Sequence, residues 1–109
     1  MSMLKYEVRH SQASERDLDS IFRCIAVDLC EPVVTANLID EIDKEIGNLD
    51  VMPERYQMLN IPEFQELGYR KMVIRKNYIA LYTIDEMRRI VYVERVLDAR
   101  RDWVRLLLV

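Results

Sequence analysis

The chain has 109 residues, of which 50% are hydrophobic and 32% are charged, and its formal net charge is −3. This composition predicts one globular domain over residues 1–109 and excludes a disordered chain. No apolar run reaches the roughly 18 residues of a membrane span, and the N-terminus lacks an apolar signal segment, so we expect a cytoplasmic protein without a membrane partner.

A strand is expected first, because apolar and polar residues alternate from Leu4 to His10. His10 is the only histidine, and at the end of a strand we expect it to be structural. The next helix begins at a serine cap, Ser11 or Ser14, and it continues to about Cys30 because apolar residues recur at helical spacing.

Pro32 then starts a second helix, since proline suits the first turn of a helix and not its interior. The short joint predicts an αα-hairpin whose apolar residues face the core. The expected core positions are Leu18, Ile21, Phe22, Ile25 and Leu29 in the first helix and Val34, Leu38, Ile42, Ile46 and Leu49 in the second. Cys24 and Cys30 are six residues apart, which is not metal-ligand spacing, so we expect both to be buried thiols.

Residues 50–68 form a long connection with apolar anchors at Met52, Tyr56, Met58 and Phe64, which is typical of a packed loop. Three strands rich in Val, Ile and Tyr follow, from about residue 69 to residue 97. Their short breaks predict an antiparallel meander. With the first strand added, the expected fold class is α+β, in the order β-α-α-β-β-β, with the helical hairpin on one face of the sheet.

Charge is unevenly distributed along the chain. Residues 1–68 carry 6 Lys/Arg against 14 Asp/Glu, whereas residues 69–109 carry 10 Lys/Arg against 5 Asp/Glu. The basic part indicates a surface for a polyanion or an acidic peptide. The alternative is that its cations lie on a solvated face or contact the acidic part.

Arginines gather at the last strand and tail, where Arg95 is followed by Arg100 and Arg101. Clustered guanidinium groups can bind phosphates bidentately, and nearby aromatic side chains could stack on bases. For the aromatic residues the alternative is packing, and for Trp103 it is anchoring of the tail on the sheet. Enzyme signals are weak: the chain has two glycines, one histidine and no zinc spacing. We therefore expect no metal and no cofactor.

Four segments carry a resemblance to a known family. They are residues 52–56 (MPERY), 68–71 (GYRK), 77–82 (NYIALY) and 95–103 (RVLDARRDW). In this element order the chain resembles the RelE/ParE toxin superfamily, in its ParE-like, plasmid-stabilisation branch, over nearly its whole length. The resemblance implies the toxin of a bacterial type II toxin–antitoxin pair. It also implies a cognate antitoxin, through which alone operator DNA would be bound.

Three functions follow from the resemblance. The first is growth arrest by binding DNA gyrase, and the second is ribosome-dependent cleavage of mRNA by Arg75, Arg95 and Arg100 with Tyr78 or Tyr82. The third is a degenerate toxin that only binds its antitoxin. Asp98 stands where nucleases of the family often have histidine, and residues 50–68 hold a single basic residue, which favours binding over catalysis. The expected target- or antitoxin-binding residues are Arg70, Lys71, Arg75, Arg95, Arg100, Arg101 and Trp103.

Overall fold

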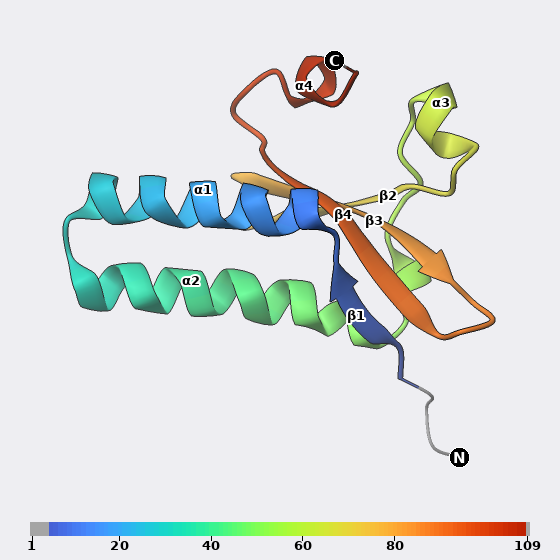
Figure 1. Ribbon diagram of the computed structural model, residues 1–109, viewed down its shortest axis with the longest axis horizontal. Coiled ribbons are helices and arrows are strands. Elements are labelled where there is room, and N and C mark those ends of the chain that lie inside the picture. The colour runs from blue at the N-terminus through green and yellow to red at the C-terminus, as the bar shows by residue number, and fades with distance from the viewer. Residues whose placement is uncertain (1–4, 109) are drawn as a thin grey trace.

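A four-stranded sheet in the order β1-β4-β3-β2 organises the fold of this computed structural model, which describes residues 5–108 (Figure 1). The strands are β1 (Glu7–His10), β2 (Arg70–Ile74), β3 (Tyr78–Asp85) and β4 (Ile90–Asp98). β2, β3 and β4 form the predicted antiparallel meander, and β1 pairs with β4 in parallel. The predicted α+β fold is confirmed, and Leu4 lies outside the described residues.

Two local features shape the meander. The β2–β3 turn places Arg75 and Lys76 at φ values of 50° and 67°, the left-handed geometry that matches a hairpin to the twist of its strands. On β4 a β-bulge interrupts the pairing, because Leu81 pairs with Arg95 whereas Tyr82 pairs with Val93. The extra residue is Glu94, and bulges of this kind change the direction of the strand and of its side chains.

The helical hairpin consists of α1 (Gln12–Leu29) and α2 (Pro32–Gly47). The Ser11 hydroxyl caps α1 by accepting the Ser14 N–H, and Pro32 occupies the first turn of α2. Figure 1 shows the two helices running antiparallel on one side of the sheet. Their apolar residues and the facing strand residues form the main core, which includes Leu18, Ile25, Ile42, Ile46, Tyr82 and Val93.

The end of the hairpin corrects part of the predicted core. Leu29 and Val34 are 41% and 49% exposed, and the thiols of Cys24 and Cys30 are exposed rather than buried. In Figure 1 the joint between α1 and α2 projects beyond the edge of the sheet, so no strand covers the last turn of α1 or the first turn of α2. Helical periodicity locates the apolar face of a helix, but it does not tell how far the partner surface extends.

Short helices occupy the segments that the sequence leaves irregular. They are η1 (Asn48–Asp50), η2 (Pro53–Arg55), α3 (Pro62–Gln65) and the C-terminal α4 (Trp103–Leu108). Of the four expected loop anchors, Tyr56 packs against the main core, whereas Met52 is half exposed and belongs to neither core cluster, as is also true of Met58.

A second, smaller core lies on the sheet face opposite the hairpin, which we call the outer face. Leu59, Ile79, Leu81 and Leu97 form it, and Phe64 and Trp103 pack against it. Figure 1 accordingly shows α3 and α4 on the side of the sheet away from α1 and α2. The expectation that Trp103 anchors the tail on the sheet is confirmed. None of the described helices is both long and apolar enough to cross a bilayer.

Candidate functional site

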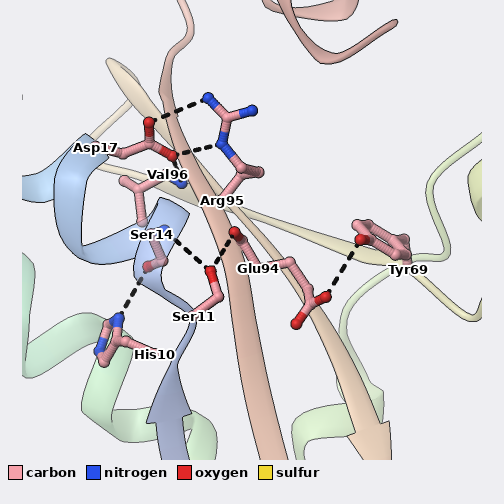
Figure 2. A network of polar contacts seen from close by, with 8 residues as sticks. All are labelled: His10, Ser11, Ser14, Asp17, Tyr69, Glu94, Arg95 and Val96. Carbon is pink, nitrogen blue, oxygen red and sulfur yellow. Dashed lines mark hydrogen bonds and ion pairs between the residues drawn. The ribbon is translucent and has the colours of Figure 1, made fainter.

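The Arg95 side chain is held by α1. Asp17 on α1 accepts hydrogen bonds from Arg95 Nε at 2.7 Å and from Arg95 Nη2 at 3.1 Å, and it also accepts the Val96 backbone N–H at 3.0 Å (Figure 2). Hydrogen bonding to Asp17 raises the pKa of Arg95. Arg95 therefore stabilises the joint between α1 and β4.

The same joint contains a chain of weaker polar contacts. β1 ends at His10, which pairs with Val93, so the side of β4 that faces away from β3 has no neighbouring strand beyond Val93. The Ser11 hydroxyl donates to the Glu94 carbonyl at 2.7 Å, and His10 Nδ1 lies 2.9 Å from the Ser14 hydroxyl (Figure 2). The start of α1 thus satisfies backbone groups that a longer β1 would have paired. His10 is part of this joint, as expected for a structural histidine.

Arg70 and Arg75 are engaged as well. Arg70 Nη1 donates to the backbone carbonyls of Glu54 at 3.1 Å and Tyr56 at 2.6 Å, so it fixes the loop that contains η2. Arg75, at the β2–β3 turn, forms an ion pair with Glu41 on α2. Together with the Arg95–Asp17 pair, this contact joins the basic part of the chain to its acidic part, which is the alternative that the charge distribution left open.

Arg100 lies at the end of β4, where it makes a bidentate contact with Asp98. Its Nε and Nη2 are 3.0 and 2.9 Å from the two carboxylate oxygens, and its guanidinium lies 5.9 Å from the centre of the Tyr78 ring. Hydrogen bonding to Arg100 lowers the pKa of Asp98 below its ordinary value. Asp98 therefore acts as the ion-pair partner of Arg100.

Tyr82 is fully buried, and its hydroxyl donates to the Pro53 carbonyl. Burial raises the pKa of this hydroxyl far above its ordinary value of 10.0. A catalytic base must be within reach of its substrate and must lose a proton near neutral pH. Tyr82 therefore lies in a setting unlike that of a general base, and its assignment to a nuclease site stays a prediction. Tyr78, the other tyrosine considered, is also buried.

Three of the predicted site residues remain available at one end of the outer face. Lys71 lies on β2 with its ammonium 5.8 Å from the centre of the half-buried Trp103 ring, which is within cation–π range. Arg101 is exposed and lines a groove of about 160 Å³ between α1, β4 and α4, together with Asp17, Arg95, Cys24 and Leu106. This end of the sheet brings together a cation, an aromatic surface and a groove with mixed polar and apolar lining, which are features of a binding surface.

Sequence reasoning missed two residues at this end of the molecule. Asp17 organises the α1–β4 joint, and the available signal was a carboxylate next to Leu18 on the core-facing side of an amphipathic helix. Arg105 is exposed on α4, a helix that the sequence did not predict. No group of three potential metal ligands occurs among residues 5–108.

Comparisons with known proteins agree with this architecture. Residues 8–103 match the family described as "ParE toxin of type II toxin-antitoxin system, parDE". A chain of the chromosomal ParDE toxin–antitoxin system from P. aeruginosa has a TM-score of 0.69 and 14% identity, covering 85% of this chain and 95% of that one. A chain of the RelBE2 toxin–antitoxin complex from Mycobacterium tuberculosis has a TM-score of 0.61 and 24% identity, covering 92% and 98%.

At these identities the likeness to the two solved structures shows a shared fold. No curated protein matches the chain in sequence. The family match begins within β1 and ends at the start of α4, so it includes most of β1, the three strands of the meander and both long helices. The chain belongs to the ParE toxin family of type II toxin–antitoxin systems.

Proposed function

We propose that this toxin acts in the cytoplasm by binding DNA gyrase, that it thereby arrests growth, and that a cognate antitoxin neutralises it. One observation carries the proposal. The cations that an RNA-cleaving site would need, Arg75, Arg95 and Arg100, are each paired with a carboxylate of the same chain. The tyrosine assigned to that site is buried.

The pairs weaken the nuclease alternative for a physical reason. A transition state of phosphoryl transfer is stabilised by positive groups that face the reacting phosphate without a competing anion. Here Asp17, Glu41 and Asp98 pair with those guanidinium groups. The Arg95 and Arg100 pairs both involve β4, whereas the Arg75 pair joins the β2–β3 turn to α2. A binding surface needs no such free cluster, since apolar and aromatic side chains supply most of its energy.

We assign the binding surface to Lys71, Arg101 and Trp103 at the α4 end of the outer face. Arg100 is exposed at the margin of this surface, whereas Arg70, Arg75 and Arg95 contribute by holding the loop, the turn and the joint around it. Substitution of the first group should remove binding from a folded protein. Substitution of the second group should first reduce stability.

The decisive experiment measures two activities of one purified preparation. Gyrase supercoiling is assayed with increasing toxin, and mRNA cleavage is mapped by primer extension in a translation extract. Inhibition of supercoiling without codon-positioned cuts supports the proposal. Cuts without inhibition would identify an mRNA endonuclease, and the absence of both, with no growth arrest on expression alone, would identify a degenerate toxin.

A variant pair locates the surface. Lys71→Ala combined with Arg101→Ala should abolish growth arrest while lowering the stability by no more than about 1 kcal/mol. Neither side chain makes an ion pair or a hydrogen bond within residues 5–108, and Lys71 loses only its cation–π contact with Trp103. The matched control is Arg23→Ala, which removes an exposed cation of α1 that is ion-paired with Asp19 one turn away. Equal growth arrest by both variants would place the active surface elsewhere.

A further inference from the structure

A shallow trough of about 610 Å³ lies on the other half of the outer face, away from α4, between the α3–β2 connection and the β3–β4 turn. Tyr69 and Tyr92 line it, and two apolar side chains border it, Leu67 and Met87, which are 66% and 96% exposed. We call this region the outer trough. Large apolar side chains this exposed around a hollow are typical of an interaction site.

The outer trough is acidic although it lies in the basic part of the chain. Asp85, Glu86 and Glu94 line it, and no Lys or Arg does. Glu86 and Glu94 accept hydrogen bonds from neutral tyrosine hydroxyls. Asp85 is ion-paired with Arg88 at 3.8 Å, and Arg89 lies against the Tyr6 ring, but neither arginine lines the trough. Figure 2 shows the Glu94 side chain turned toward Tyr69 and away from the Arg95 pair. A site of this charge repels a phosphate backbone and attracts a cationic polypeptide.

The chain itself carries the complementary surface. Arg101 and Arg105 are exposed at the C-terminal end, and their side chains make no ion pair within residues 5–108. On the same short helix Leu106 and Leu108 are 50% and 56% exposed, while Trp103 and Leu107 pack on the sheet. The α4 region is thus a basic projection with outward apolar side chains, and the outer trough is an acidic hollow with apolar borders.

The α4 region and the outer trough lie at opposite ends of the same outer face, an arrangement that suits a twofold-symmetric pair of copies. When two copies turn their outer faces toward each other about a twofold axis, each α4 region meets the other copy's trough, and both contacts form at once. We propose that the free toxin forms a homodimer in which each α4 region occupies the partner's outer trough. Two identical contacts per dimer make the pairing closed rather than filamentous.

The dimer has a functional consequence that rests on the proposed function. It covers Lys71 and Trp103, the surface assigned above to target and antitoxin, so the active form would be the monomer. Dilution or high salt would then favour the active species, since the contacts are largely electrostatic and are screened by salt.

The test is sedimentation equilibrium of the wild type and of two charge variants at low and high salt. One variant is Glu86→Gln with Glu94→Gln, which keeps an acceptor for each tyrosine hydroxyl while removing two charges. The other is Arg101→Glu with Arg105→Glu. We expect a wild-type mass of twice the chain mass at low salt, and a dissociation constant raised at least about tenfold in either variant and in high salt.

A compensating pair excludes a mere loss of folding. Glu86→Lys with Glu94→Lys, mixed with Arg101→Glu and Arg105→Glu, should restore a dimer between two chains that are each monomeric alone. Asp40→Lys with Asp43→Lys on α2 is the charge-matched control and should stay dimeric.

Three results would overturn the proposal. The first is a monomeric wild type at low salt, and the second is a dimer whose dissociation constant is unchanged in both variants. The third is a monomeric wild type together with loss of antitoxin binding by the Glu86→Gln, Glu94→Gln variant, which would assign the trough to the antitoxin. Sedimentation equilibrium measures molecular mass and does not depend on gyrase. A failure of the gyrase proposal and a failure of the dimer proposal can therefore be distinguished.

Discussion

Removal of the Asp17 carboxylate should destabilise the protein more than removal of the exposed Asp19 carboxylate on the same helix. Asp17 accepts three N–H groups, two from Arg95 and one from the Val96 backbone. The side chains of Asp17 and Arg95 are 16% and 31% exposed, so water can rehydrate part of the guanidinium but reaches the joint poorly. Asp17→Ala leaves the Val96 N–H without its acceptor and Arg95 without its anion.

The magnitude follows from these contacts. Hydrogen bonds to a charged group contribute about 1.5–3 kcal/mol each, and an unpaired buried donor costs about 1–3 kcal/mol. Partial exposure of Arg95 lowers its share, so we expect Asp17→Ala to reduce the free energy of unfolding by about 2–3 kcal/mol. Asp17→Asn keeps an oxygen for the Val96 N–H and loses the ion pair, and it should cost about 1–2 kcal/mol.

Urea unfolding followed by circular dichroism measures these changes. Asp19→Ala is the matched control, because Asp19 lies two residues away in an exposed pair with Arg23 and should change the stability by less than about 0.5 kcal/mol. A double-mutant cycle of Asp17→Ala with Arg95→Ala should give a coupling of about 1 kcal/mol. A stability of Asp17→Ala within 0.5 kcal/mol of the wild type, or a coupling near zero, would refute the idea that this contact holds α1 to β4.

Three further results are expected. Tyr82→Phe leaves the buried Pro53 carbonyl without its donor, so we expect the free energy of unfolding in urea at neutral pH to fall by about 1 kcal/mol. An unchanged urea midpoint would contradict a stabilising role of this hydrogen bond. The hydrogen bond to Arg100 lowers the pKa of Asp98 in the folded protein. The stabilisation from this carboxylate is therefore present above the ordinary pKa of 3.8 and is lost as the pH falls through the folded pKa. Asp98→Asn should be less stable than the wild type at pH 7, and the difference should shrink in thermal melts at acid pH. Cys24 and Cys30 should both react with Ellman's reagent in the native protein, and a reaction that waits for denaturant would contradict their exposure.

Local patterns in the sequence were enough for most of the fold. Alternation and short breaks located β2, β3 and β4, and helical spacing with Ser11 and Pro32 located α1 and α2. These signals depend on residues within one turn or one strand, and they are therefore readable without tertiary information. The direction of β1 was not readable, because alternation is the same in a parallel and an antiparallel strand. The six residues of α4 are too few to show a period.

The site was less predictable than the fold, and its pairs explain why. Arg95 meets Asp17 across 78 positions of the chain, and Arg75 meets Glu41 across 34. The basic cluster in the sequence thus forms separate internal contacts, and the partners of Arg95 and Arg75 are ones that no local pattern indicates. Trp103 was placed correctly because a large aromatic residue beside an apolar sheet has one favourable position.

The parallel pairing of β1 with β4 also has a consequence for how the protein is made. The contacts that close the sheet join residues about 80 positions apart, as in the bonds of Tyr6 to Glu86 and of Ser11 to Glu94. Such high contact order slows folding, since the chain loses the entropy of a long loop before the contact forms. A nascent chain cannot complete this sheet until β4 has left the ribosome. Pulse-labelled hydrogen exchange should show the amides of β1 protected last during refolding, and early protection of β1 would contradict this order.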